Sequence, residues 1–315
     1  MTVSVLHTAD AWWLKTPNGA AKIDTTATTT AALLADRVAL DAAIEAAASA
    51  DTVSPESLKL VSPVTRPCRV VAQMTNFESH VKDAGMDPAL VPLTFFRKAS
   101  ASISGPFDDI VKPPHVKLLD YEVEIGLVIG RAIPVGTSIS DANLAEFIAG
   151  LVVTNDVSAR DIQLPQTQFY EAKSYPTFTP VGPELVLLTA EELKRFGDLR
   201  LRLSVNGHQR QNALVDGDML YRPMQALQSL TQFQELAAGD LVLTGTPAGT
   251  ALSAPPKPVQ IIGNLLPPAL KWKMFFRRQT GNPKYLRHGD IVEASVATDD
   301  GAIDLGTQRS AVRFA

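Results

Sequence analysis

The sequence has a single cysteine, Cys68, and this scarcity limits the structures that it can adopt. One cysteine cannot form an internal disulfide or a cysteine-based zinc site, and it fits a reducing compartment. The N-terminus also lacks a basic segment followed by an apolar one, and no run approaches the roughly 18 uninterrupted apolar residues of a membrane span. We therefore expect a cytoplasmic protein without a membrane span.

An excess of charge of either sign is missing as well. The 29 lysines and arginines stand against 33 aspartates and glutamates, which gives a net charge of -4. Such a chain has no overall field to attract a polyanion such as nucleic acid, so an anionic substrate would have to meet local positive charge. Hydrophobic residues make up 45% of the 315 residues, enough for a substantial core in one large domain, or in one large and one small domain.

Residues 1–65 are expected to form a small N-terminal domain or arm. Residues 26–50 are rich in alanine, with apolar residues at mostly helical spacing, and they predict a helix. Three prolines then interrupt regular structure between residues 51 and 67 and place a domain boundary near residue 65. Residues 66–315 would form the main domain.

Short apolar runs of strand length recur after this boundary. They are bounded by Gly, Pro, Asn or Asp, and they occupy residues 70–72, 121–129, 150–154, 184–188, 199–205, 241–244 and 291–295. Helical patterns are fewer, at residues 77–84, 141–149 and 224–230. This mixture predicts an α+β fold that is rich in β-structure.

Two glutamates in DYEVEIGLVIG, residues 120–130, are candidate metal ligands. Side chains two apart in a strand lie on the same face, so Glu122 and Glu124 would project together. Carboxylates placed in this way repel unless a cation joins them, and Mg²⁺ or Mn²⁺ prefers oxygen ligands. Taken alone, the pattern fits a half-exposed strand with an acidic outer face better than a metal site.

A second polar cluster follows a later apolar run, in VVTNDVSARDIQ at residues 152–163. A strand ending there would deliver the carboxylate of Asp156, and Arg160, Asp161 and Gln163 follow closely, as is typical of a site. The alternative is an Asx-type turn at Asp156 with a surface pair between Arg160 and Asp161. The local pattern does not decide between them.

His80 and Asp83 lie three residues apart in MTNFESHVKD, residues 74–83. On a helix this spacing places the carboxylate beside the imidazole, where it would fix the tautomer and raise the basicity of the ring. The pair would suit a general base, although a lone histidine is more often structural.

Four segments in this order resemble the signature of the fumarylacetoacetate hydrolase family: DYEVEIGLVIG, NDVSARD, AKSYPTFTPVGP and TGTPAGT. The resemblance extends from about residue 68 to residue 307. It implies that the main domain is the catalytic domain, with the mixed β-sheet roll of the family, and that the protein is a homodimer. It also implies that Glu122, Glu124 and Asp156 hold Mg²⁺ or Mn²⁺, which Ca²⁺ can replace in a crystal. His80 matches the catalytic histidine of the family.

The chain departs from the family pattern in three places. Asp83 stands where the family generally has the longer Glu, and Lys98 is followed by Ala99 in place of the usual Pro. Residues 251–285 form a longer separation between TGTPAGT and LRHGD than the family commonly has. Within them KWKMFFRRQ, residues 271–279, is expected to form a lid, a subunit contact or an ordinary surface loop. Association with a membrane surface would need a more strongly amphipathic segment than this one.

These parts predict a Mg²⁺- or Mn²⁺-dependent hydrolase that cleaves a carbon–carbon bond in a ketonic substrate. The substrate would be a 2,4-dioxo acid of the acylpyruvate, fumarylpyruvate or fumarylacetoacetate type, whose carboxylate and adjacent keto oxygen would chelate the cation. His80, oriented by Asp83, would activate water, and Lys173 or nearby backbone N–H groups would stabilise the oxyanion. The candidate substrate-binding residues are Arg160, Gln163, Lys98 and Thr246.

Other activities fit the same resemblance. Decarboxylases, isomerases and hydratases acting on 2-oxo acids would use the same cation to stabilise an enolate, and the fold does not choose among them. A non-catalytic binding protein of this fold would not need His80, Lys173 and the three carboxylates together. The resemblance further implies a role in aromatic catabolism.

Overall fold

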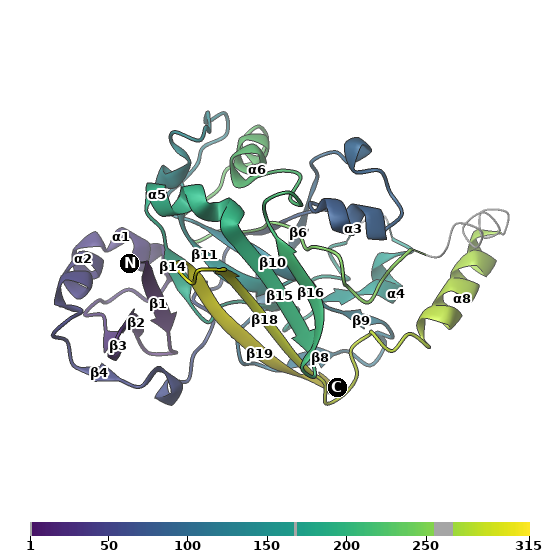
Figure 1. Cartoon of the computed structure of the whole chain (residues 1–315), viewed down its shortest axis with the longest axis horizontal. Helices are drawn as coiled ribbons and strands as arrows, with labels where there is room; N and C mark the ends of the chain where they lie inside the picture. Colours follow the sequence, from purple (N-terminus) through teal and green to yellow (C-terminus); the bar gives the residue numbers. More distant parts are fainter. Residues whose placement is uncertain (1, 167–168, 255–266) are drawn as a thin grey trace.

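The computed structural model describes residues 2–166, 169–254 and 267–315. In this part of the chain, ten strands form one large mixed sheet and five strands form a smaller sheet. Figure 1 shows the N-terminal strands and helices at one end of the molecule and helix α8 at the other. The predicted α+β fold, rich in β-structure, is confirmed.

Several neighbouring strands in each sheet come from distant parts of the chain. In spatial order, the large sheet contains β4 (Thr52–Val53), β3 (Gly19–Lys22), β2 (Trp12–Thr16), β1 (Val3–His7), β14 (Leu185–Leu187), β11 (Ile148–Asn155), β10 (Val123–Ile129), β17 (Leu241–Leu243), β5 (Val70–Gln73) and β6 (Phe95–Lys98). The smaller sheet contains β16 (His208–Leu214), β15 (Leu199–Val205), β18 (Ile291–Thr298), β19 (Asp304–Phe314) and β8 (Ile110–Lys112). Two short pairs are β12 (Ser158–Ala159) with β9 (Leu119–Asp120), and β13 (Thr179–Pro180) with β7 (Ile103–Ser104).

Helices in the described residues are short and connect these strands. The α-helices are α1 (Thr30–Ala35), α2 (Arg37–Ala46), α3 (Glu78–Asp83), α4 (Arg160–Gln163), α5 (Ala190–Leu193), α6 (Pro223–Leu230) and α8 (Pro268–Gln279). The 3-10 helices are η1 (Pro55–Ser57), η2 (Pro88–Leu90), η3 (Ser100–Ser102), η4 (Leu144–Glu146) and η5 (Lys194–Asp198). No helix in this part of the chain is both long and apolar enough to cross a membrane.

Strand β10 is buried along its whole length because both of its faces are covered. Its side chains alternate between the two faces, so Leu127 belongs to one apolar core and Val128 to the other. The first core includes Leu201 of the smaller sheet, and the second includes Leu33 and Leu40 of the N-terminal helices. Full burial of such a side chain stabilises the fold by about 1.5–3 kcal/mol. The large sheet is therefore the middle layer of the molecule.

The N-terminal strands extend the large sheet. Strand β1 pairs antiparallel with β14, with Val5 opposite Leu185, and β2 to β4 follow outward. A salt bridge between Lys15 of β2 and the buried Glu184 adds a second link. The described residues of the 1–65 segment thus share hydrogen bonds with strands of the main domain.

The predicted helix over residues 26–50 is two helices that meet at Asp36. The N–H of Asp36 donates to the carbonyl oxygen of Ala32 at 3.0 Å, which closes α1, and its side chain accepts from the N–H of Ala39 at 3.2 Å, which begins α2. An aspartate that accepts such an N–H stabilises a helix start, so this residue interrupts a segment whose composition favours one helix.

The predicted helix over residues 141–149 is wrong. Only the single turn η4 forms there, and Ile148 already begins β11. This strand pairs with β10 on one side and β14 on the other, and these long-range ladders outweigh the local helical pattern. The other two predicted helices, over residues 77–84 and 224–230, correspond to α3 and α6.

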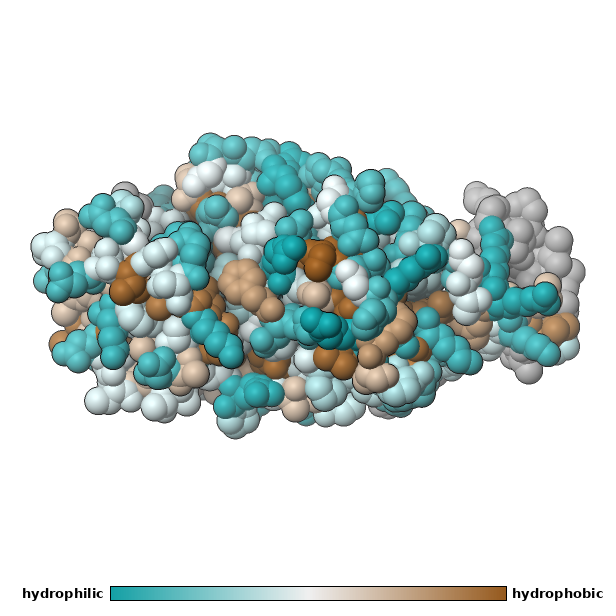
Figure 2. All heavy atoms as spheres, turned by 90° about the horizontal axis from the view of Figure 1, so that it is seen from below, coloured by the Kyte–Doolittle hydropathy of each residue, from teal (hydrophilic) through white to brown (hydrophobic). Residues whose placement is uncertain are grey.

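Part of the 251–285 segment lies outside the described residues, at 255–266, and the remainder contains α8. Trp272 stacks on Phe276 with ring centroids 5.6 Å apart, and Phe276 packs against the first core. Leu270 and Met274 remain exposed on the helix. Figure 2 shows that hydrophobic residues on one face of the molecule occur in small patches among hydrophilic ones. The lid and the subunit contact stay predictions.

Replacing Gly150 by Ala should destabilise the large sheet where the N-terminal strands join it. A Cβ atom on Gly150 would lie 2.3 Å from the backbone oxygen of Val186, so β11 and β14 would have to move apart. Overpacking of this kind costs about 1–3 kcal/mol, which we expect as a lower free energy of unfolding in urea. Gly281→Ala is the control, because its nearest neighbour would be the oxygen of Arg278 at 3.5 Å. Equal unfolding free energies for the two variants would contradict this explanation.

Candidate metal centre and active site

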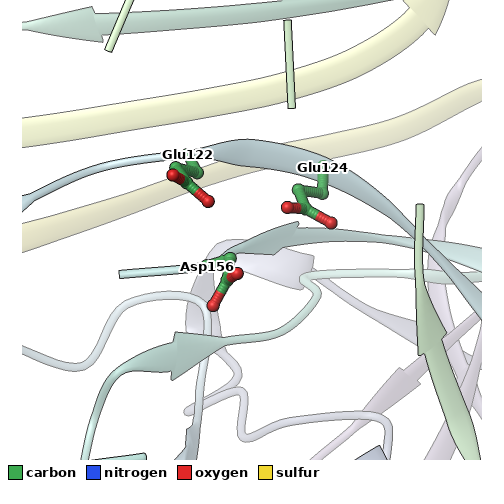
Figure 3. Close-up of side chains that lie close together, drawn as sticks. All are labelled: Glu122, Glu124 and Asp156. Carbon is green, nitrogen blue, oxygen red and sulfur yellow. The ribbon is translucent and has the colours of Figure 1, made fainter. Parts of the chain in front are cut away.

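The register between β10 and β11 brings three carboxylates to one face of the large sheet. Val123 pairs with Asn155, so Glu122, just before β10, lies opposite Asp156, just after β11. The N–H of Asp156 donates to the carbonyl oxygen of Glu122 at 2.8 Å. Glu124 follows two residues later and therefore lies on the same face. Figure 3 shows the three side chains close together.

The spacing of these carboxylates suits a divalent cation. One oxygen from each of Glu122, Glu124 and Asp156 lies within 4.8 Å of the others, and all three residues are buried. Two ligand oxygens of one cation can be no further apart than twice the metal–oxygen distance, which is about 2.0–2.6 Å for Mg²⁺ and Ca²⁺. Twice that distance is about 4.2 Å for Mg²⁺ and about 5.2 Å for Ca²⁺, so a separation of up to 4.8 Å lies within the limit for Ca²⁺, and the three predicted ligands would have to close in slightly around Mg²⁺.

Two buried lysines lie against these carboxylates. Lys173 Nζ donates to Glu122 Oε2 at 2.6 Å and to Asp156 Oδ2 at 2.7 Å. Lys98 Nζ donates to Asp156 Oδ1 and to the carbonyl oxygen of Phe178, the latter at 2.9 Å. Like charges opposite each other on neighbouring strands repel, and Lys173 offsets this repulsion between Glu122 and Asp156. Both lysines thus bind the protein's own carboxylates in this structure.

Arg160 is the third buried cation, and its guanidinium contacts three side chains. Nε donates to Asp120 Oδ2 at 2.8 Å, and the two terminal nitrogens donate to Gln163 Oε1 at 2.7 Å and to Glu122. Sequence reasoning missed Asp120, which is 0% exposed. A signal was present, because the alternation that selected Glu122 and Glu124 also includes the residue two positions before them.

Gln211 is a second residue that sequence reasoning missed. Its amide nitrogen donates to Thr246 Oγ1 and to the carbonyl oxygen of Pro247, both at 2.8 Å, and its amide oxygen accepts from the N–H of Val123 at 3.0 Å. Thr246 Oγ1 donates in turn to the carbonyl oxygen of Val123 at 2.9 Å. These bonds fix the TGTPAGT segment against β10 and engage the hydroxyl proton of Thr246, whose substrate-binding role stays a prediction.

Glu124 receives a backbone hydrogen bond that depends on a glycine. The N–H of Gly245 donates to Glu124 Oε2 at 2.6 Å. Gly245 has a φ of +85°, and a Cβ atom there would lie 2.8 Å from the Cβ of Asn76. Glycine alone among the residues adopts this conformation without strain and allows so close an approach of the backbone.

The pKa of Glu124 is shifted in the opposite direction from that of Glu122. Burial alone would raise the pKa of Glu122, but Arg160 and Lys173 outweigh burial and hold it at about 2. The pKa of Glu124 is raised well above its ordinary value by burial and by the charges of Asp156 and Glu122. No lysine or arginine among the described residues forms a salt bridge with Glu124. A divalent cation would supply the positive charge that this carboxylate lacks, so the residues present fit such an ion.

His80 lies on α3, and the charged side chains of the carboxylate cluster act on its imidazole. Burial lowers the pKa of His80; Glu122 raises it, and Arg160 and Lys173 lower it further. The ring is therefore neutral at neutral pH. Its buried Nδ1 has no hydrogen-bond partner in the described part of the chain, so no bond to Asp83 is formed here. The orienting role of Asp83 stays a prediction.

The chain is similar to proteins of known family. Residues 69–313 match the family described as fumarylacetoacetate (FAA) hydrolase C-terminal. The oxaloacetate tautomerase Fahd2a, mitochondrial, of Rattus norvegicus is 34% identical over 220 residues, which are 69% of this chain and 68% of that protein. The 2,4-didehydro-3-deoxy-L-rhamnonate hydrolase of Sphingomonas sp. (strain SKA58) is 31% identical over 277 residues, which are 85% of this chain and 84% of that protein.

A solved structure resembles the whole chain. It is that of a probable 2-hydroxyhepta-2,4-diene-1,7-dioate isomerase from Mycobacterium abscessus, with a TM-score of 0.72 and 28% identity. The similarity covers 100% of this chain and 99% of that one, so it includes the N-terminal strands as well as the carboxylate cluster.

Glu124→Gln should lower the affinity for Mg²⁺ or Mn²⁺ by about 100-fold or more, because even residues behind metal ligands typically contribute 10–100-fold. Glutamine preserves the side-chain volume and can still accept from Gly245 N–H, so the lost charge is the main change. Isothermal titration calorimetry measures the affinity. Glu184→Gln, which neutralises another buried carboxylate, is the matched control. An unchanged affinity in Glu124→Gln would remove this residue from the ligand set.

Proposed function

The chain belongs to the fumarylacetoacetate hydrolase family, and we propose that it is a Mg²⁺- or Mn²⁺-dependent hydrolase that cleaves a carbon–carbon bond in a 2,4-dioxo acid. The observation that carries the proposal is the convergence of Glu122, Glu124 and Asp156 within 4.8 Å, in a cluster whose charges also act on His80. A cation site next to a neutral imidazole supports water activation beside a site that binds substrate oxygens.

Glu122, Glu124 and Asp156 would hold the cation, which when bound supplies Lewis-acid stabilisation of negative charge on a substrate oxygen. The set of donors is made of oxygen atoms alone, which favours the hard cations Mg²⁺ and Mn²⁺. Lys173 and Lys98 keep positive charge beside Glu122 and Asp156, so these carboxylates stay close together.

His80 would act as the general base in the hydrolysis. The neutral ring takes a proton from water, and the water oxygen adds to the carbonyl carbon distal to the substrate's carboxylate. The bond between this carbon and the neighbouring methylene carbon then breaks, and its electron pair passes to the enolate of a 2-oxo acid. His80 returns the proton to the enolate carbon, which gives a carboxylic acid and a pyruvate-type product. Lys173 would donate to the oxyanion once it exchanges a bond to Glu122 or Asp156, and Asp83 would orient the imidazole.

Arg160 and Gln163 support binding of the substrate's carboxylate. The guanidinium has five N–H donors, and three of them go to Asp120, Glu122 and Gln163, so two remain for a ligand. Lys98 and Thr246 would first have to exchange the bonds that they make within the protein. Arg160 and Gln163 are therefore the substrate contacts that we favour.

Tautomerisation of a 2-oxo acid such as oxaloacetate is the second candidate function. It is favoured by the 34% identity to an oxaloacetate tautomerase and by the unpartnered Nδ1 of His80. Tautomerisation moves a proton between the carbon next to a keto group and the keto oxygen. It needs no attacking water, and its base can be a weaker one than the hydrolysis needs. The same carboxylates and cations would serve this reaction.

A panel of substrates should separate the two candidates. The protein loaded with Mg²⁺ or Mn²⁺ is mixed with acylpyruvates, fumarylpyruvate and oxaloacetate, and the enol absorbance and the products are followed. We expect a 2,4-dioxo acid to give two acids, one of them pyruvate. Loss of the oxaloacetate enol without new products would favour the tautomerase instead. If no compound reacts faster with the metal-loaded protein than with the same protein stripped of metal, neither function holds.

His80→Ala should lower kcat by about 10²–10⁴-fold with metal affinity intact, because the general base is lost. The base works unprotonated, and the pKa of His80 is lowered from 6.5, so the fall of kcat/KM with acid should lie below pH 6.5 in the parent. This acid limb should be absent in the variant. His208→Ala, which removes an exposed histidine, is the control. An unchanged kcat/KM in His80→Ala would leave His80 with a structural role only.

Several properties implied by the sequence stay predictions. They are the homodimer, the cytoplasmic location, the role in aromatic catabolism and the absence of a nucleic-acid partner. Light scattering on the intact protein measures the first of these directly.

A further inference from the structure

Asp120 has every acceptor position in use. Its Oδ1 accepts from the N–H groups of Tyr121 at 2.9 Å and Ala251 at 2.8 Å, and its Oδ2 accepts from Arg160 Nε at 2.8 Å and from the N–H of Leu252 at 3.1 Å. An ionised carboxylate offers about four acceptor sites. Asp120 therefore has none left for a cation or a substrate, and any effect that it has on the reaction passes through its neighbours.

Arg160 is the neighbour through which Asp120 reaches the site. A guanidinium is planar and carries its donors in a fixed fork, so holding Nε sets the direction of both terminal nitrogens. Arginine is not deprotonated in proteins, so both terminal nitrogens act only as donors. With Nε on Asp120, the terminal nitrogens meet Glu122 and Gln163.

Gln163 receives its orientation from Arg160. Arginine can only donate, so the 2.7 Å contact must be made by the amide oxygen of Gln163, and the amide nitrogen is left at the other end. Among the described residues, this nitrogen makes no hydrogen bond that would compete with a ligand. Arg160 thus donates to Asp120 on one side and to the amide oxygen of Gln163 on the other. The free end of the Gln163 amide is its nitrogen, which can only donate.

We propose that Asp120 is a positioning residue that acts through Arg160 to fix the amide of Gln163 as a hydrogen-bond donor toward the substrate. The site then selects a substrate that presents an acceptor oxygen, carboxylate or keto, to Gln163. This inference rests on the proposed function and adds a residue that controls substrate binding without touching the substrate.

The test is a double-mutant cycle on Asp120 and Gln163 in the metal-loaded protein. Asp120→Asn preserves the volume and keeps one oxygen for backbone N–H groups, but it loses the charged partner of Arg160. Binding of pyruvate is measured by calorimetry, together with KM and kcat for the reactive member of the panel. Hydrogen bonds to charged groups contribute enough that Asp120→Asn should weaken pyruvate binding by roughly 10-fold. Because Arg160 also binds Glu122, Asp120→Asn should lower metal affinity as well, so pyruvate binding is measured at saturating Mg²⁺ or Mn²⁺ in every variant.

The coupling between the two residues decides the inference. If Asp120 acts through Gln163, Asp120→Asn should weaken pyruvate binding less in the Gln163→Ala background than in the parent, and the loss that remains there measures the direct contact of Arg160. Losses that multiply would overturn the inference while leaving the proposed function intact, and so would unchanged binding in Asp120→Asn. A parent protein that neither binds pyruvate nor turns over any panel compound contradicts the proposed function and this inference with it.

Two further variants exclude a general loosening of the fold. Asp240 is also buried and accepts from the N–H of Arg69 at 2.7 Å, the guanidinium of Arg69 at 3.1 Å and the N–H of Ala237 at 2.7 Å. It lies at the opposite end of β17 from Gly245, so Asp240→Asn should lower stability without changing pyruvate binding. Equal weakening in both Asp→Asn variants would overturn the inference. If Asp120→Asn does not fold, Asp120→Ser takes its place in the cycle, because a serine hydroxyl still accepts from a backbone N–H but offers no charge to Arg160.

Discussion

The pairing register of β10 with β11 is the constraint on which the whole site depends. It places Glu122 opposite Asp156 and leaves Glu124 beside them on the same face. Strand side chains alternate, so a slip of one residue would turn both glutamates into the apolar core on the other face of the sheet. Both faces of β10 are packed against apolar cores, and this packing fixes the register. The carboxylates could not fix it themselves, because they repel one another.

Bringing so many charges into the interior is unfavourable by itself. Desolvation costs several kcal/mol per ion, and the attraction between the ions offsets this only when the hydrogen bonds are nearly complete. Here Lys173 spans Glu122 and Asp156, and Arg160 reaches Glu122 and Asp120. The fold holds these charges together, and their arrangement lowers the pKa of Glu122 and raises the pKa of Glu124. Glu124 forms no salt bridge among the residues that the structure describes, so it is the position where a bound ion changes the charge balance most.

The second layer of the site decides how specific it can be. Asp120 binds the N–H groups of Ala251 and Leu252, at the start of the 251–285 segment, as well as Arg160. Gln211 binds β10 and the TGTPAGT segment in the same manner. A hydrolase, an isomerase and a tautomerase can share three metal-binding carboxylates, so the choice among reactions depends on what these outer residues orient.

The sequence by itself determined the β-rich class, the family and the same-face placement of Glu122 and Glu124, because an alternation of two residues is a local property that can be read along one strand. It left open whether Asp156 ends a strand at a site or caps a turn, and it passed over Asp120 and Gln211. The tertiary structure decided these points, since the partners of these residues come from far along the chain: Arg160 lies 40 residues from Asp120, and the hydrogen bond from Gly245 to Glu124 spans 121 residues. The helix expected over residues 141–149 was lost for the same reason, because hydrogen bonding to β10 and β14 outweighed a helical pattern only nine residues long.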